Sequence, residues 1–170
     1  MILIVGTLLV AELVPAPRPL ASAEIPSIYE VIAADPRTNV RVLELPFGIS
    51  DGTRTIGKTS SLKQFYQTAH GKPIVGGYIS RVSARRFADI DNDPVLGVLI
   101  RLNEAQPLPS ERITMFERNW HDFVKRFDIG YVVLDADRAS ADLRHVVTNH
   151  MNLEEIARDG PVELYRPRTL

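Results

Sequence analysis

The stretch IGYVVLD, residues 129–135, decides the fold. It is a short continuous run of apolar and aromatic residues that ends at Asp135, and such a run is typical of a strand buried inside a sheet. The stretch VRVLELP, residues 40–46, alternates and predicts another strand, which Pro46 ends. We therefore expect a sheet built around a central strand at 129–135.

Segments with helical periodicity lie between the predicted strands. The signals are clearest at 60–71, where Ser60 or Ser61 can cap a helix and Gly71 ends it. The apolar face of this helix consists of Leu62, Phe65, Tyr66 and Ala69. The other predicted helices span residues 26–35, 83–90, 92–103, 110–127 and 138–151.

The order of these elements predicts an α/β fold. A strand with paired glycines is expected at 73–79, and two short strands at 153–167 flank a turn at Asp159-Gly160. The Gly-, Ser- and Thr-rich stretch at 47–60 predicts a loop. We expect residues 26–170 to form a single α/β domain, with a mixed, mostly parallel sheet of about four to five strands, helical crossovers and a C-terminal hairpin.

The N-terminus differs from the rest of the chain. Residues 1–14, MILIVGTLLVAELV, carry one charge and no Lys or Arg. They suit the end of a membrane helix, although a buried first strand or helix and an atypical signal peptide remain alternatives. Residues 15–25 are rich in Pro and Ala and predict an extended linker.

Composition limits the classes of function. Hydrophobic residues make up 45% of the chain and charged residues 24%, which argues against a wholly disordered protein. The net charge of −1 leaves no basic excess to neutralise a phosphate backbone, so nucleic acid is not an expected partner. The chain has no cysteine, which excludes disulfides, thiolate metal sites and a cysteine nucleophile.

The stretch GTRTIGKT, residues 52–59, matches the phosphate-loop pattern G-x-x-x-x-G-K-[ST]. This alternative function is a nucleotide-binding protein with a Mg-nucleotide as its cofactor. The residues that would hold the nucleotide are Gly52, Gly57, Lys58 and Thr59. A helix follows as the motif requires, but the preceding strand ends at Pro46, which leaves five residues of loop. A solvated loop and no cofactor are therefore the favoured interpretation.

Four segments carry a resemblance to a known family. They are VLELP (Val42 to Pro46), which overlaps the stretch LELPFGISDG (Leu43 to Gly52), YQTAHGKPIVGGYISR (Tyr66 to Arg81), FDIGYVVL (Phe127 to Leu134) and RDGPVELYR (Arg158 to Arg166). The chain resembles, over roughly residues 1–166, the C-terminal extramembrane region of bacterial multi-spanning membrane proteins of the GT-C glycosyltransferase type. These include dolichyl-phosphate-mannose-transferase-like proteins.

The resemblance implies a role beside a membrane. It implies a non-catalytic accessory domain on the extracytoplasmic face of the cytoplasmic membrane, for substrate recognition or for support of the membrane-embedded part. Residues 1–14 would end the last membrane helix, so the chain would be part of a longer protein. Its partners would be the membrane or that membrane-embedded part, and a lipid-linked sugar. The catalytic acidic residues of the family lie near its first membrane helices, so no catalytic residue carries over.

Two groups of residues are candidates for substrate binding. The first group, which flanks the predicted strand at 73–79, is His70, Lys72, Tyr78 and Arg81. His70 and Lys72 could donate to an anionic group, although both residue types are also favoured where a helix ends. The second group, Asp135 and Asp137, follows the strongest strand, at the edge where α/β sheets bind ligands. A simpler explanation is that Asp137 or Ser140 caps the helix that follows.

Metal and nucleophile motifs receive little support from the sequence. His145 and His150 are five residues apart, whereas the zinc-protease pattern requires four with a Glu between them, so no metal site is expected. No serine lies in a G-x-S-x-G elbow. Beside the accessory domain and the nucleotide-binding protein, a stand-alone binding module without enzyme activity remains a third hypothesis.

Overall fold

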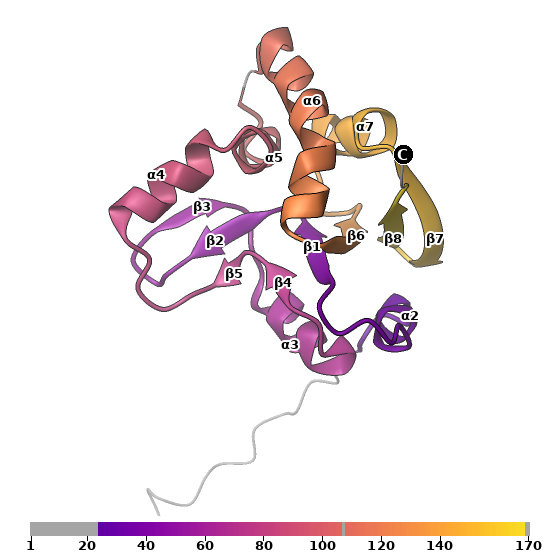
Figure 1. The fold of residues 1–170 in the computed structure, drawn as a ribbon. Coiled ribbons are helices and arrows are strands. Elements are labelled where there is room, and N and C mark those ends of the chain that lie inside the picture. The colour runs from indigo at the N-terminus through magenta and orange to yellow at the C-terminus, as the bar shows by residue number, and fades with distance from the viewer. Residues whose placement is uncertain (1–23, 107, 169–170) are drawn as a thin grey trace, which may run out of the picture.

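The computed structural model describes residues 24–106 and 108–168, and this part of the chain is an α/β fold with six helices and two mixed sheets (Figure 1). Its helices are α2 (Ile28–Ala33), α3 (Ser61–His70), α4 (Ala84–Asn92), α5 (Leu96–Asn103), α6 (Ser110–Arg126) and α7 (Ala141–His150). Within this part, no helix is long and apolar enough to cross a membrane. The predicted membrane helix end at 1–14 and all but the last two residues of the linker at 15–25 lie outside the described residues.

The larger sheet has five strands in the order β4-β1-β6-β8-β7. These strands are β1 (Arg41–Leu45), β4 (Ile74–Val75), β6 (Ile129–Asp135), β7 (Leu153–Asp159) and β8 (Val162–Pro167). The predicted strand at 129–135 is central and buried, as expected. It pairs in parallel with β1 and antiparallel with β8, and β8 pairs antiparallel with β7. The C-terminal hairpin is confirmed. Because β8 pairs antiparallel with both β6 and β7, only the pairs β4–β1 and β1–β6 are parallel, and the prediction of a mostly parallel sheet is confirmed only in part.

A second, three-stranded sheet was not expected. Its strands β2 (Gly48–Ser50), β3 (Thr55–Gly57) and β5 (Gly77–Tyr78) lie in the order β3-β2-β5. The predicted loop at 47–60 was therefore wrong, because it contains a hairpin. The predicted strand at 73–79 divides at Gly76, whose φ of +92° lies in the left-handed region. A Cβ at this position would lie 2.7 Å from the carbonyl oxygen of Gly48 and 2.7 Å from the Phe47 ring.

Helices cover both faces of the larger sheet (Figure 1). On one face, strand residues such as Leu43 and Leu134 pack with α5, α6 and α7 in the main core. On the other face, Val42 and Val133 pack with α2 in a smaller cluster. The alternation of side chains along a strand explains this division, because residues i and i+2 point to the same face.

The helix α3 forms where it was predicted, but its buried face was predicted wrongly. Ser60 caps the helix and Gly71 ends it in the left-handed conformation. The apolar side chains of Leu62 and Phe65 are 49% and 40% exposed, whereas the cationic Lys63 is buried. Glu44 on β1 explains why Lys63 is buried in place of the apolar residues. Its carboxylate lies on the face of the sheet that α3 covers, beside Lys63.

Candidate functional site

An open groove of about 540 Å³ lies between the two sheets and the helix α4. Its apolar lining comes from both sheets and three helical segments: Phe47, Ile49, Ile74, Val75, Ile79, Val82, Ile90, Leu96 and Phe127. Gly76 and Phe47 both line the groove, and the absence of a side chain at Gly76 lets the Phe47 ring lie close to the backbone there. Its size is that of a ligand pocket, which spans about 300–1,000 Å³.

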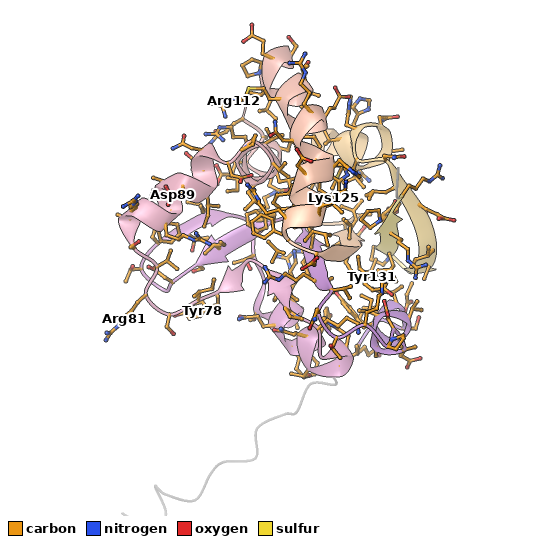
Figure 2. All side chains as sticks on the ribbon, viewed as in Figure 1. Tyr78, Arg81, Asp89, Arg112, Lys125 and Tyr131 are labelled. Carbon is orange, nitrogen blue, oxygen red and sulfur yellow. The ribbon has the colours of Figure 1, made fainter. Side chains whose placement is uncertain are left out.

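Three arginines border the groove. Arg41 comes from the start of β1, Arg81 from the segment after β5, and Arg86 from the first turn of α4. Within the described residues, none of the three guanidinium groups forms an ion pair, and no carboxylate side chain lines the groove. Arg81 projects outward from the edge of the molecule near Tyr78 (Figure 2). The groove therefore combines an apolar lining with a cationic border.

Arg81 is held at this border by its backbone. Its φ of 56° is in the left-handed region, which a residue with a side chain seldom adopts. The next residue, Val82, donates its amide hydrogen to the Asp51 carboxylate at 3.4 Å, and Ser83 caps α4 by accepting from the amide of Arg86. These contacts join the border of the groove to the turn of the β2–β3 hairpin.

A second, smaller cavity of about 60 Å³ lies at the carboxyl ends of β1 and β6. Glu44 is 4% exposed there and accepts a hydrogen bond from the Tyr29 hydroxyl at 3.1 Å. The Lys63 ammonium donates to the carbonyl oxygen of Pro46 at 2.6 Å. Asp135 and Arg138 complete the charged lining. Parallel strand ends are where α/β sheets commonly bind ligands, so this cavity is also a candidate site.

Burial shifts the pKa values of the two charged groups in this cavity, Glu44 and Lys63, toward neutral pH. Burial raises the pKa of Glu44 to about 7, while the positive charge of Lys63 and the hydrogen bond from Tyr29 act against this increase. Burial lowers the pKa of Lys63 to about 8, and the charge of Glu44 opposes that decrease. Burial thus disfavours the charged form of each group, and perturbed pKa values of this kind are frequent at functional sites.

The structure places His70 and Lys72 together, away from both cavities. The Lys72 ammonium donates to the carbonyl oxygens of Asp35 and Arg37, at 2.8 Å each. The His70 ring stacks on Tyr29 at 5.6 Å, and its Nδ1 accepts from the Lys72 amide at 3.1 Å. Burial, together with the charge of Lys72, lowers the pKa of His70 to about 4. These two residues tie the end of α3 to the connection between α2 and β1.

The other predicted binding residues are spread over the molecule. Arg81 borders the groove and Asp135 lines the strand-end cavity. Tyr78 is 52% exposed, and Asp137 is exposed in the turn that follows β6. Asp137 does not cap α7, because Ser140 accepts from the Leu143 amide there. The predicted set therefore does not form a single site.

The phosphate-loop residues lie on the β2–β3 hairpin. Gly52 is in its turn, and Gly57 ends β3. The amide of Gly57 donates to the Glu104 carboxylate at 2.9 Å, and the amide of Lys58 donates to the carbonyl oxygen of Phe47 at 3.0 Å. Lys58 is exposed, and Thr59 precedes the cap of α3. Amides that already donate within the protein are not available to phosphate oxygens.

Sequence reasoning missed Glu44 and Lys63. Glu44 looked like the polar member of an alternating strand, and Lys63 lay outside the apolar stripe of its helix. One signal was available, because residues 42–45 are otherwise apolar and both faces of a strand between parallel neighbours are buried. A charged residue in such a strand needs a buried partner.

Neither a metal-binding cluster among the described residues nor a known relative assigns a function to these cavities. Among the residues that the structure describes, no group of three or more His, Asp or Glu side chains could hold a metal ion. Comparison of the chain with protein-family models, curated proteins and solved structures finds no match.

Proposed function

We propose that this chain is a non-catalytic binding domain that acts beside a membrane and uses the groove as its ligand site. In this proposal it is the extracytoplasmic accessory domain of a membrane protein of the glycosyltransferase type, for recognition of a lipid-linked substrate or for support of the membrane-embedded part. The single observation that supports it is that many of the residues lining the groove come from segments that carry the family resemblance.

All the segments that carry the family resemblance, except the C-terminal one, contribute residues to the groove. Residues 66–81 contribute Ile74, Val75, Gly76, Ile79 and Arg81, and the start of the FDIGYVVL segment contributes Phe127. Phe47 and Ile49 belong to the stretch LELPFGISDG, which carries the same resemblance. Segments that are far apart in sequence thus build one surface, and a shared binding surface explains why they would resemble the same family.

Binding suits the groove better than catalysis does. Its cationic groups are guanidiniums, which donate hydrogen bonds and keep their protons at physiological pH. The Ser83 hydroxyl accepts from the Arg86 amide and caps α4. These groups can orient a ligand, but they do not constitute a nucleophile and its base.

The exposed apolar residues of α3 support contact with a partner. Leu62 and Phe65 lie on its outward face. Tyr78 and Ile79, which are also exposed, lie at the adjacent edge of the small sheet. The Gln64 side chain of α3 donates a hydrogen bond to the Tyr78 carbonyl oxygen at 2.9 Å and joins the helix to this edge. Neighbouring apolar side chains on a surface mark interaction sites. The membrane, or the membrane-embedded part of the parent protein, is the proposed partner.

Single-cysteine labelling tests the location, because the native chain has no cysteine. Ala88→Cys places a thiol on the exposed side of α4. In bacterial spheroplasts, we expect a membrane-impermeant maleimide to label this variant before lysis, and the labelled chain to remain with the membranes after a high-salt wash. Labelling only after lysis would overturn the proposal. Labelling before lysis with release from the membranes would favour the stand-alone binding module.

A further inference from the structure

We propose that the groove binds a single-chain amphipathic anion, with its hydrocarbon tail along the apolar lining and its anionic head group against Arg81 and Arg86. This inference rests on the proposed function, because it assumes that the groove is the ligand site. It goes further by assigning the ligand a chemical class from the physical chemistry of the groove alone.

The lining selects for a hydrocarbon segment. Phe47, Ile49, Val75, Ile90 and Phe127 are apolar side chains that converge from different elements on one cavity. Water in such a cavity finds few hydrogen-bond partners, and an apolar chain that displaces it is favoured. A volume of about 540 Å³ in an open groove accommodates one chain and leaves one end exposed to solvent.

The border of the groove selects for an anion. Arg81 and Arg86 both lie at the junction of β5 and α4, and Ser83 between them is the N-cap of α4. Within the described residues these guanidiniums have no carboxylate partner, so an incoming anion has no internal competitor to displace. A guanidinium forms paired hydrogen bonds with carboxylate or phosphate oxygens, and the positive end of the α4 dipole adds to this attraction.

The projecting position of Arg81 fits the same assignment. Its side chain extends from the edge of the molecule (Figure 2), and Arg81 is among the residues that line the groove. Its backbone is held in the left-handed region at φ 56°, and the neighbouring Val82 amide is bonded to Asp51. The residue is therefore anchored by its backbone, while its guanidinium is free to contact a head group.

Calorimetry on the full chain tests the assignment with four probes of matched design. Dodecyl phosphate and dodecanoate, below their micelle concentrations, carry the tail with either kind of anionic head. Dodecyl maltoside carries the tail with a neutral head, and inorganic phosphate is the head alone. We expect both anionic amphiphiles to bind about tenfold or more tightly than dodecyl maltoside, and inorganic phosphate to bind more weakly than dodecyl phosphate. The ratio of the two anionic probes identifies the head group as phosphate or carboxylate.

Variants locate the site. Arg81→Gln combined with Arg86→Gln should weaken dodecyl phosphate binding by about tenfold or more and leave dodecyl maltoside unchanged. Arg85→Gln is the matched control, because Arg85 is exposed on the same helix and does not line the groove. Ile79→Asn, at a position that is 46% exposed, should weaken both amphiphiles, and circular dichroism checks that each variant is folded.

Each contrary result removes a different part of the inference. Equal binding of dodecyl phosphate and dodecyl maltoside would overturn the anionic head group. Equal binding of dodecyl phosphate and inorganic phosphate would overturn the tail. If a folded chain bound none of the four probes, the groove would not be the ligand site, while the location measured by cysteine labelling would still stand or fall separately.

Discussion

Glu44 is a buried acid whose protonation affects the stability of the fold. It is buried beside Tyr29 and Lys63, and burial raises its pKa from 4.5 to about 7. A folded-state pKa above the unfolded value means that the folded protein gains stability from the protonated carboxyl. This gain is fully present below about pH 4.5 and is lost as the pH rises through about 7.

Replacement of Glu44 by Gln should remove this pH dependence. From pH 4.5 to 7, we expect the free energy of unfolding of the native chain to fall relative to that of Glu44→Gln by up to about 3 kcal/mol. Urea unfolding at a series of pH values measures the difference. Glu154→Gln, at an exposed position on β7, is the control and should follow the native curve. Parallel curves for Glu44→Gln and the native chain would show that Glu44 keeps an ordinary pKa.

Lys72 has a structural contact that its sequence position did not reveal. Its ammonium bonds two carbonyl oxygens in the connection between α2 and β1, and the side chain is 5% exposed. Lys72→Met leaves both acceptors without this donor, so we expect the free energy of unfolding to fall by about 2–3 kcal/mol. Lys125→Met, on the exposed side of α6, should change it by less than about 0.5 kcal/mol. An unchanged stability, together with weaker ligand binding, would instead support the binding role first expected for Lys72.

At the scale of elements, the β2–β3 hairpin accounts for the glycines of the phosphate-loop pattern. Gly57 has a φ of +69°, and a Cβ there would collide with the carbonyl oxygen of Phe47. We expect Gly57→Ala to lower the free energy of unfolding by about 2 kcal/mol or more, and Lys58→Ala to change it by less than about 0.5 kcal/mol. Calorimetry with Mg-ATP or Mg-GTP should show no binding to the native chain. Micromolar binding that disappears in Lys58→Ala would contradict this interpretation.

Elements with a strong internal pattern could be predicted from the sequence. The strand β6 is a continuous apolar run, the stripe through Phe116, Trp120 and Phe123 on α6 is buried, and the Asp159-Gly160 turn joins β7 to β8. Each of these signals is local, because propensity and periodicity act within a few residues. The outcome for these elements therefore depended little on their tertiary contacts.

Elements whose structure depends on distant partners could not be predicted. The strands β2 and β3 are three residues each, and β2 also pairs with β5, where Ile49 lies opposite Gly77, 28 positions further along the chain. On α3, Lys63 is buried and donates to the Pro46 carbonyl oxygen in another part of the chain, so the hydrophobic pattern of the helix indicated the wrong face. Tertiary contacts outweighed local propensity in both places.

At the scale of the whole molecule, the candidate site is a product of topology. The groove is lined by residues between Arg41 and Phe127, contributed by both sheets and by α4. Single positions were recognisable in the sequence, such as Arg81 and Asp135, but they belong to different cavities. The groove residues come together only through strand pairing. The strand β1 pairs with β4 in the larger sheet, and β2 pairs with β5 in the smaller one.

The short segment from Glu44 to Phe47 connects the two cavities. Glu44 faces the strand-end cavity, the Pro46 carbonyl accepts the Lys63 ammonium, and Phe47 lines the groove. If a ligand shifts the backbone at Phe47, it also shifts the neighbouring Pro46 carbonyl that accepts from the Lys63 ammonium. Occupancy of the groove and the number of protons bound by the protein are then thermodynamically linked, and the linkage is reciprocal. In that case, a change in pH would change the affinity of the groove for a ligand.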